Sequence, residues 1–291
     1  MEPDVIVAGT DGSEQSLCAV DWAAREAMTR GAALQIVAVP SMPHRMVWQR
    51  TPGVGPDTVA DVIVRSYERA LASAAERAAE TEPGVAISSR LLSGPPAQSL
   101  CEAGEHASML VVGSRGGGAF AALLLGSVSR YASTHADCPV VVVRNETMAV
   151  HREVVVGVRD LDQPSAIGFA FEEAALRKAR LRAVHAWGWF LPEMRLMGTE
   201  RPGASSQELT SEASHWLTGL LSFWREKYPE VDVIEDVARA HPARILAGFS
   251  ARADLIVLGR NTPGNSPHRG TNAVTHAVLS HAHGPVAVIA E

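Results

Sequence analysis

Residues 107–130 read ASMLVVGSRGGGAFAALLLGSVSR, and this stretch decides the fold. A short, wholly apolar run at 109–112 is followed at once by a glycine-rich turn at 113–118 and, after a second apolar run, by Gly126 and Ser127. The first run is typical of a strand that is buried on both faces of a parallel sheet. Glycines after such a strand let backbone amides turn toward an anion. The pattern predicts a turn and a helix that close around a phosphate, and a turn without a ligand is the alternative.

The same order of motifs occurs twice along the chain. The segments GPPAQSL, ASMLVVGSR and CPVVVVR of the first half recur in the second half as AHPARIL, ADLIVLGR and GPVAVIA. Gly113 and Gly259 are separated by 146 positions, and the matched prolines keep the same offset. One offset over so many positions indicates a tandem duplication. The chain of 291 residues is therefore expected to hold two domains, at 1–146 and 151–291.

Each half alternates short Val-rich runs with Ala-rich segments of helical spacing. This alternation predicts an α/β fold with two tandem open parallel five-stranded sheets, covered by helices on both faces in a Rossmann-like manner. The expected strands are 5–10, 34–39, 85–91, 109–113 and 140–144, then 154–158, 181–187, 231–237, 254–258 and 286–290. The expected helices of the first half are 14–30, 58–80, 96–106 and 126–136. Two longer irregular segments, 40–57 and 188–206, follow the second strand of each half.

The composition argues against several classes of protein. Hydrophobic residues make up 46% of the chain and charged residues 20%, which is ordinary for a folded protein and unlike a disordered one. The formal net charge of −6 argues against a general nucleic-acid binder. The 3 cysteines have no metal-like spacing and favour a reducing compartment. Because the sequence shows neither a basic leader nor a membrane-length apolar run, we expect a cytoplasmic protein with no membrane span.

The candidate site lies at the carboxyl ends of the expected strands, where ligands bind in open α/β sheets. Residues 9–13, 39–40 and 113–116 follow three of these strands and would border one crevice. Residues 127–129 would present amides and hydroxyls at the start of the next helix, where the helix dipole favours negative charge. No Gly-Lys-Ser/Thr sequence follows the glycines, and no G-x-G-x-x-G opens a helix after the first strand. The P-loop and dinucleotide-binding interpretations therefore lose their main support.

The spacing of the glycines resembles that of a known family. Gly113, two residues, Gly116, nine residues and then Gly126-Ser127 form the pattern G-2x-G-9x-G-S/T of the universal stress protein family, in its ATP-binding subgroup. The resemblance extends to VAGTDGS at 7–13 and covers essentially the whole chain as two tandem copies. It implies the fold of the adenine nucleotide α hydrolase-like group.

The resemblance also implies an ATP site in the first copy. Asp11, with Gly9 and Thr10, would lie beside the adenine and ribose. Val39 would contact the adenine through its backbone, and Gly113 would meet the ribose or the α-phosphate.

The phosphate end of that implied site draws on both glycine segments, with a divalent ion, Mg²⁺, bridging the phosphate oxygens. The residues expected to hold the phosphates are Gly116, Gly126, Ser127, Val128 and Ser129. Arg115 could reach a phosphate or form a local salt bridge, because arginine serves both uses.

Several of these residues have a purely structural alternative. Asp11 could be a helix N-cap or a turn residue, because Asp-Gly-Ser is favourable turn chemistry. Ser127 and Ser129 could simply cap a helix, a role that is compatible with phosphate binding. The apolar run at 120–125 is expected to pack in the core rather than to form a partner surface.

The second copy departs from the motif. Thr262, Asn272 and Ala273 align with Gly116, Gly126 and Ser127. Asp11 aligns with Arg159, unless a one-residue shift restores the acid at Asp160. A side chain replaces glycine and a hydroxyl is lost, so the second nucleotide motif is expected to be degenerate. The histidines of this half lack a recognisable metal-binding spacing, although His281 and His283 would share a face if they lay on a strand.

These features predict an ATP-binding universal stress protein that acts as a nucleotide-dependent regulator, not as an efficient catalyst. No G-x-S-x-G or H-E-x-x-H motif and no obvious water-activating base accompanies the glycines, so only weak ATPase activity is expected. A slow nucleotide hydrolase or adenylyl-transfer enzyme and a nucleotide-free interaction scaffold are the alternatives. The fifth strands, at 139–144 and 285–290, are expected to pair edge to edge within the chain or in a homodimer. The regulatory protein partner is not identified by the sequence.

Overall fold

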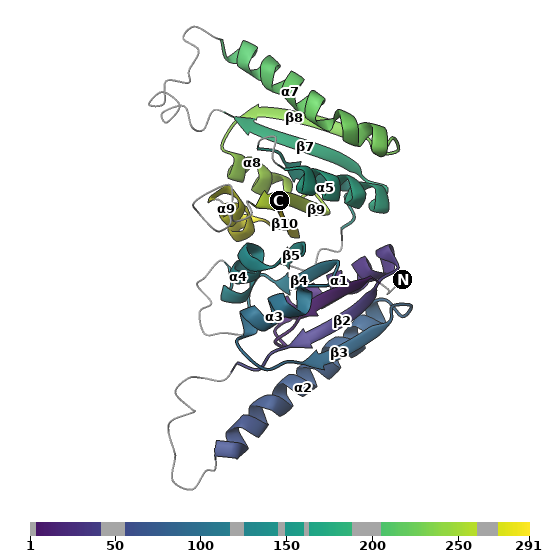
Figure 1. Ribbon diagram of the computed structural model, residues 1–291, viewed down its shortest axis with the longest axis vertical. Coiled ribbons are helices and arrows are strands. Elements are labelled where there is room, and N and C mark those ends of the chain that lie inside the picture. The colour runs from purple at the N-terminus through teal and green to yellow at the C-terminus, as the bar shows by residue number, and fades with distance from the viewer. Residues whose placement is uncertain are drawn as a thin grey trace. The chain divides into compact units, whose positions relative to one another are not determined.

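The computed structural model describes residues 4–41, 56–116, 125–144, 149–159, 163–187, 205–260 and 273–291, with the backbone alone for 56–59. The chain divides into two compact units, Met1–Glu146 and Thr147–Glu291. In each unit five parallel strands form a sheet with helices on both faces (Figure 1). The two units, called unit 1 and unit 2, are described separately.

The sheet of unit 1 has the strand order β3-β2-β1-β4-β5. Its strands are β1 (Val5–Gly9), β2 (Ala33–Ala38), β3 (Ile87–Leu91), β4 (Met109–Gly113) and β5 (Val140–Val143). Every strand is parallel to its neighbours within the unit. The central strands β1 and β4 are almost wholly buried, as their apolar sequences require.

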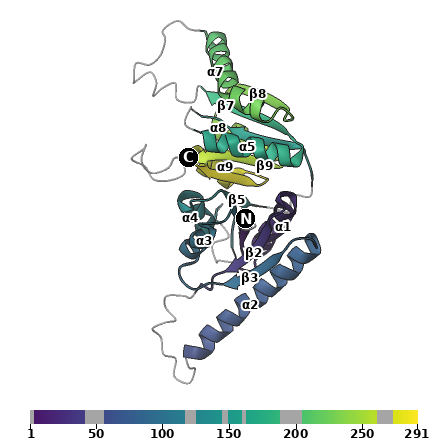
Figure 2. The same cartoon turned by 45° about the vertical axis from the view of Figure 1, so that its right-hand side comes forward.

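The helices of unit 1 cover the sheet in pairs (Figures 1 and 2). They are α1 (Glu14–Arg30), α2 (Pro56–Thr81), α3 (Pro96–Gly104) and α4 (Ser127–His135). Helix α1 packs with α2, and α3 packs with α4. Helix α1 begins after Ser13, whose side chain accepts a hydrogen bond from the Ser16 amide, and ends at Gly31 with a φ of 67°.

Unit 2 repeats this architecture with the strand order β8-β7-β6-β9-β10. Its strands are β6 (Glu153–Gly157), β7 (Arg180–Trp187), β8 (Val233–Arg239), β9 (Leu255–Arg260) and β10 (Val286–Ala290). Its helices are α5 (Pro164–Arg177), α7 (Ser206–Lys227), α8 (Pro242–Phe249) and α9 (Ala273–His281). Helix α5 packs with α7, and α8 packs with α9.

The fold class predicted from the sequence is confirmed, and the predicted strands differ from the observed ones by at most two residues at either end. Strand β3 begins at Ile87 rather than at 85 because the Val85 amide donates to the Glu82 carbonyl in a turn, 3.2 Å away. Strand β8 is shifted for the same reason, since the Val231 amide donates to the Tyr228 carbonyl at 3.1 Å. Apolar composition alone does not distinguish a buried turn from a strand end.

Some predictions fall wholly or largely outside the described residues. They concern residues 42–55 and 188–204 of the irregular segments, and residues 120–124 of the apolar run. His281 ends helix α9 and is not on a strand, so it does not share a strand face with His283. In the described part of the chain, no helix has both the length and the apolar character needed to cross a membrane.

An ion pair fastens α2 to α1 in unit 1. The Nε of Arg77 donates to both carboxylate oxygens of Asp21, at 3.0 and 2.8 Å. The side chain of Asp21 is 4% exposed and that of Arg77 is 30% exposed. The hydrogen bond from Arg77 to Asp21 raises the pKa of the Arg77 guanidinium above its ordinary value. The ion pair links the two helices.

A second ionic cluster lies across the first strands of unit 2. Glu153 on β6 accepts from Arg180 at 2.6 Å and from Arg182 at 2.8 Å, and its side chain is 4% exposed. Burial acts to raise the pKa of Glu153, but the hydrogen bonds and charges of Arg182 and Arg180 outweigh it and lower the pKa below its ordinary value. Asp254 completes the cluster by accepting from the amides of His151 and Glu153.

Candidate functional site

The turn between β1 and α1 is held by a closed set of hydroxyl and amide contacts. The Ser16 hydroxyl donates to the Ser13 carbonyl at 2.8 Å, so it accepts from the Thr10 hydroxyl at 3.0 Å. The Thr10 hydroxyl in turn accepts from the Gly12 amide at 3.2 Å. The Asp11 amide donates to the Ser16 hydroxyl at 3.3 Å. The turn is thus shaped by its own side chains, and Ser16 is a member that sequence reasoning missed.

Asp11 serves this turn as an acceptor. Its Oδ1 atom accepts from the Ser13 amide at 3.0 Å and from the Ser13 hydroxyl at 2.6 Å. The helix N-cap is Ser13, so of the two structural alternatives for Asp11 the turn role is the one observed. The residue is exposed, and Oδ2 is directed toward another loop, as the next contact indicates.

Two glycines at the end of β4 and just after it make close approaches of different kinds. A Cβ on Gly113 would lie 2.7 Å from the backbone carbonyl oxygen of Gln15, in the first turn of α1. A Cβ on Gly116 would collide with Oδ2 of Asp11. Gly113 therefore packs the strand against helix α1, whereas Gly116 brings the loop after β4 against the carboxylate of the loop after β1.

The second half of the glycine motif begins helix α4. The Gly126 amide donates to the Ser114 carbonyl at 2.8 Å, and a Cβ on Gly126 would lie 3.3 Å from that oxygen. Gly126 is the N-cap of α4 and supplies no side-chain cap. The first amides of a helix have no acceptor within the helix, so those of Ser127, Val128 and Ser129 are available to an anion at the start of α4.

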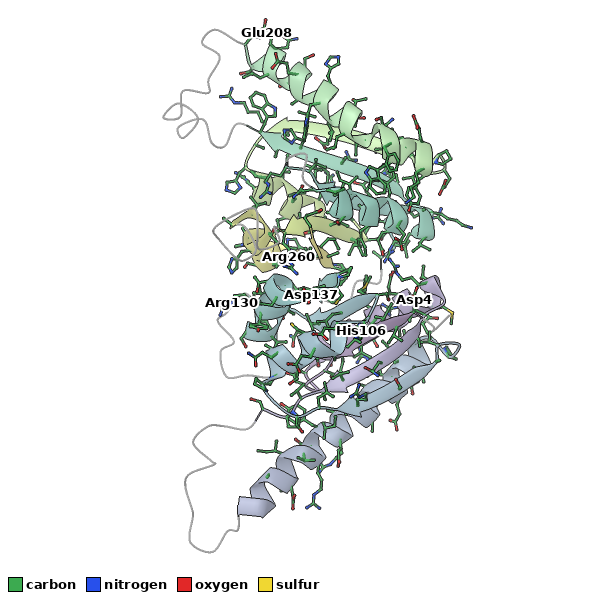
Figure 3. The ribbon with its side chains drawn as sticks, in the orientation of Figure 1. Asp4, His106, Arg130, Asp137, Glu208 and Arg260 are labelled. Carbon is green, nitrogen blue, oxygen red and sulfur yellow. The ribbon has the colours of Figure 1, made fainter. Side chains whose placement is uncertain are left out.

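The two serines of α4 have different environments. Ser127 is exposed at the helix start. Ser129 is 2% exposed, and its hydroxyl donates to the Gly113 carbonyl at 2.6 Å. A phosphate at this helix could therefore meet the Ser127 hydroxyl, but Ser129 would contribute its backbone amide. The Ser129 side chain instead ties α4 to the end of β4. Arg130, labelled in Figure 3, lies on the same helix, one turn after Gly126. The Arg130 amide donates to the Gly126 carbonyl at 3.0 Å.

Basic and polar side chains lie beside these amides. Ser114 follows β4, and its amide donates to the Val143 carbonyl at 2.7 Å, so Ser114 is beside Arg144 at the ends of β4 and β5. Burial, and secondly the charge of Arg115, lower the pKa of Arg144 from its ordinary value. Two guanidinium groups therefore lie within electrostatic reach of each other. In the described part of the chain, the Ser114 hydroxyl is buried without a hydrogen-bond partner.

The remaining predicted residues form the floor of the site. Gly9 is buried, and a Cβ there would lie 3.1 Å from a methyl group of Leu100 on α3. The Thr10 amide donates to the Val37 carbonyl at 2.8 Å, which places the end of β1 beside the end of β2. Val39 follows β2 and is 5% exposed. Thus the residues predicted from three separated segments lie at the ends of adjacent strands of one sheet.

Unit 2 differs at the equivalent positions. Gly9 pairs with Val112 across the sheet, and Gly157 pairs with Leu258 in the same way. Gly157 is therefore the counterpart of Gly9, and Arg159 is the counterpart of Asp11, with no shift toward Asp160. The Arg159 amide donates to the side chain of Gln163 at 3.1 Å, as the Asp11 amide does to Ser16. Thr262 and Asn272 lie outside the described residues.

In unit 2 a carboxylate lies beside Gly259, the counterpart of Gly113. A Cβ on Gly259 would lie 2.8 Å from the side-chain amide nitrogen, Nε2, of Gln163 and 3.0 Å from Oε1 of Glu291. The Glu291 carboxylate accepts from the Ser165 and Ala166 amides, at 3.0 and 2.9 Å. In unit 2 an internal anion thus occupies the start of α5.

The donors of unit 1 suit an anion, but the described residues do not provide a complete metal site. They contain no group of three or more His, Cys, Asp or Glu side chains arranged to hold a metal ion. The amides after Gly126, the Ser127 hydroxyl and the guanidinium of Arg115 are donors for phosphate oxygens. Asp11 is the carboxylate nearest to Gly116 and could complete the coordination of an ion that phosphates already hold.

The fold and this site define a class: two tandem parallel α/β domains of the adenine nucleotide α hydrolase-like group, with a glycine-lined loop at the carboxyl end of the first sheet. The profile of the Universal stress protein family matches residues 3–144 and again 151–290. The chain belongs to this family, in its tandem two-domain form.

Two curated relatives and one solved structure match this chain over nearly their whole length. A universal stress protein of Mycobacterium tuberculosis is 33% identical over 296 residues, covering 97% of this chain and 96% of the relative. One from Mycolicibacterium smegmatis is 32% identical over 292 residues, covering 98% and 96%. The crystal structure of a universal stress protein from Archaeoglobus fulgidus superposes with a TM-score of 0.70 at 17% identity, covering 100% of this chain and 99% of that one. A universal stress protein solved in complex with cAMP matches 49% of this chain at 28% identity, with a TM-score of 0.37.

Proposed function

We propose that unit 1 binds ATP and that the protein is a nucleotide-dependent regulator in the stress response, with little or no ATP turnover. The observation that carries this proposal is that Asp11 and the start of α4 both lie beside the loop after β4, which contains Gly116. Gly116 lies against the Asp11 carboxylate, and Gly126 is held against Ser114. A side chain at either glycine would fill the space that a ligand needs.

In this proposal the nucleotide lies along the ends of three strands, β1, β2 and β4. Asp11, Thr10 and the backbone of Val39 would hold the adenine and ribose, beside β1 and β2. The amides of residues 127–129 would hold the phosphates, helped by the Ser127 hydroxyl and Arg115. The buried Ser114 hydroxyl, which has no described partner, would gain an acceptor.

Mg²⁺ fits this arrangement as an ion carried by the phosphates, with Asp11 as its protein ligand. When bound, it neutralises phosphate charge. The chain's own residues are poorly suited to activate water, because Oδ1 of Asp11 already accepts two hydrogen bonds from Ser13. We therefore propose binding rather than catalysis as the function.

Further parts of the proposal concern the surroundings of the site. Unit 2 would retain the fold with a degenerate nucleotide motif. The fifth strands would mediate pairing of the domains or of two chains in the cytoplasm, and an unidentified regulatory protein would respond to the ATP-bound state. Val-rich strand edges favour such pairing, because open edges are otherwise prone to aggregate.

The test is calorimetric titration of the full chain with Mg-ATP, together with mass spectrometry of any nucleotide that co-purifies. Gly126→Ala with Ser127→Ala should reduce the affinity by about one to two decades, because a methyl group approaches Ser114 and a charge-assisted hydrogen bond of roughly 1.5–3 kcal/mol is lost. The circular dichroism spectrum should not change. Unaltered binding by the folded double variant would contradict the site. Rapid release of phosphate or AMP would favour the enzyme alternative, and absence of nucleotide binding would favour the scaffold.

A further inference from the structure

The carboxyl ends of the strands in unit 2 present a row of basic side chains. Strand β8 ends at Arg239, β9 ends at Arg260, and Arg159 lies two residues beyond the end of β6. Arg260 is labelled in Figure 3. We call these three residues the arginine row. Because β6 pairs with β9 and one strand separates β6 from β8, the three backbones lie at one edge of the sheet, with adjacent strands about 5 Å apart.

Unit 1 has a different charge at each equivalent position. The strand registers align Arg239 with Ser93 and Arg260 with Ser114. They align Arg159 with Asp11, as shown above. An edge with one carboxylate and two serines in unit 1 thus carries three guanidinium groups in unit 2. This edge is the one where ligands bind in this class of fold.

The Arg239 end of the row is fixed in place by its neighbours. Arg239 and Trp187 are directly paired across β8 and β7. The Arg239 guanidinium lies 5.9 Å from the centre of the Trp187 ring and donates to the Ser206 hydroxyl at 2.8 Å. Among the residues that the structure describes, the indole N–H of Trp187 is buried and has no hydrogen-bond partner. Both Arg239 and Arg159 are exposed, so the row is accessible at two of its three positions.

The far end of the row is bounded by a carboxylate. Glu291 follows β10, and its amide donates to the Arg260 carbonyl at 3.2 Å. Its side chain accepts from the first amides of α5. This carboxylate therefore lies close to the Arg159 end of the loop after β6, where Gln163 accepts from the Arg159 amide.

We propose that the arginine row is a second ligand site, which binds a multiply charged anion of the oligophosphate class. Guanidinium groups donate paired hydrogen bonds to phosphate oxygens and carry permanent charge. They would take the place of both the glycine amides and the divalent ion of unit 1, so the site binds its ligand without a metal. The site binds the phosphates of its ligand and makes no specific contact with a base. The indole N–H of Trp187 adds an uncharged hydrogen-bond donor. This site is independent of ATP binding by unit 1.

The experiment uses the full chain with Gly126→Ala and Ser127→Ala, so that the site proposed in unit 1 does not contribute. Tripolyphosphate is titrated calorimetrically in the presence of EDTA. Arg159→Met with Arg239→Met should weaken binding at least about tenfold, the loss expected for removal of charge-assisted contacts. The matched control is Arg252→Met, because this exposed arginine precedes β9 and lies at the opposite edge of the sheet. It should leave the affinity within about twofold.

The outcomes separate the possibilities. ATP should bind the EDTA-treated protein about as tightly as tripolyphosphate does, and orthophosphate should bind at least about tenfold more weakly. Binding of ATP without binding of tripolyphosphate would overturn the proposed ligand class. Absence of any tripolyphosphate binding, or equal losses from Arg252→Met and the double variant, would overturn the site. If the double variant does not fold, Arg159→Gln and Arg239→Gln are measured singly, and unchanged affinity in both would be decisive against the proposal.

Discussion

The carboxylate of Asp11 lies against Gly116, and a β-carbon on this glycine would collide with its Oδ2 atom. The two residues are more than a hundred positions apart in the chain and follow different strands, β1 and β4, which are neighbours in the sheet. The contact therefore joins the two loops that the ATP proposal requires to act together. A substitution of Gly116 therefore tests the contact between the two loops directly.

Gly116→Ala should displace the Asp11 side chain and weaken Mg-ATP binding by about tenfold or more, because the methyl group would collide with Oδ2. Adding Asp11→Ala relieves the collision. The affinity of the double variant should then be close to that of Asp11→Ala alone. Calorimetric titration of the four proteins completes the cycle, and strictly additive losses would show that the contact does not couple the loops.

Ser127→Ala and Ser129→Ala should have opposite consequences. Ser129 is buried and donates to the Gly113 carbonyl, so its loss should lower the free energy of unfolding by about 1–3 kcal/mol. Ser127 is exposed, so its loss should leave stability within about 0.5 kcal/mol and weaken Mg-ATP binding. Thermal unfolding and calorimetry together distinguish the two variants. A stability loss from Ser127→Ala as large as that from Ser129→Ala would contradict the assignment.

Arg77→Met should destabilise unit 1 by about 3–5 kcal/mol, because it leaves the Asp21 carboxylate buried without its ion pair. Arg65→Met is the matched control on the same helix, since Arg65 is 65% exposed and contacts only an exposed aspartate at 4.0 Å among the described pairs. It should cost at most about 1 kcal/mol. Replacing Asp21 by Asn in the Arg77→Met background should recover part of the loss, as measured by urea unfolding.

The stability of unit 2 should fall in acid. The pKa of Glu153 is lower in the folded protein than in the unfolded chain, so the unfolded state binds the proton more readily. The stabilisation is fully present above the ordinary pKa of Glu, about 4.3, and is lost as the pH falls through the lower folded value. Glu153→Gln should be less stable at neutral pH and should show a smaller loss of stability between neutral pH and acid. An unchanged pH dependence in this variant would exclude Glu153 as the source.

Sequence reasoning predicted the sheet well because its strands are buried on both faces and therefore have uniform composition. It also brought Asp11, Gly116 and Gly126 to one edge, since the ends of parallel strands meet there. It missed the Ser16 hydroxyl and the buried Ser129 contact, which depend on side-chain direction rather than on spacing. The arginine row was also missed, because its members are far apart in the sequence and become a row only through the strand order and registers.

The last prediction is asymmetry between the units: the intact chain should bind one Mg-ATP tightly, through unit 1. The strand registers place Arg159 where unit 1 has Asp11, and Glu291 occupies the space beside Gly259. Thr262 and Asn272, which the sequence aligns with Gly116 and Gly126, lie outside the described residues. Replacing glycines and a hydroxyl in a phosphate site costs several kcal/mol, roughly the sum of about 1–3 kcal/mol for each lost hydrogen bond.

Equilibrium dialysis of the full chain with Mg-ATP at moderate salt measures this stoichiometry. Gly126→Ala with Ser127→Ala should weaken the tight site by about one to two decades. Arg159→Met should leave it unchanged, because the arginine row binds oligophosphate more weakly and with a stronger dependence on salt. Ala273→Ser is the complementary change, since it restores a hydroxyl at the start of α9. It should not create a second tight site, because the glycines are still missing. Two sites of similar affinity in the unaltered chain would refute the asymmetry and would mean that guanidinium groups replace glycine amides without loss.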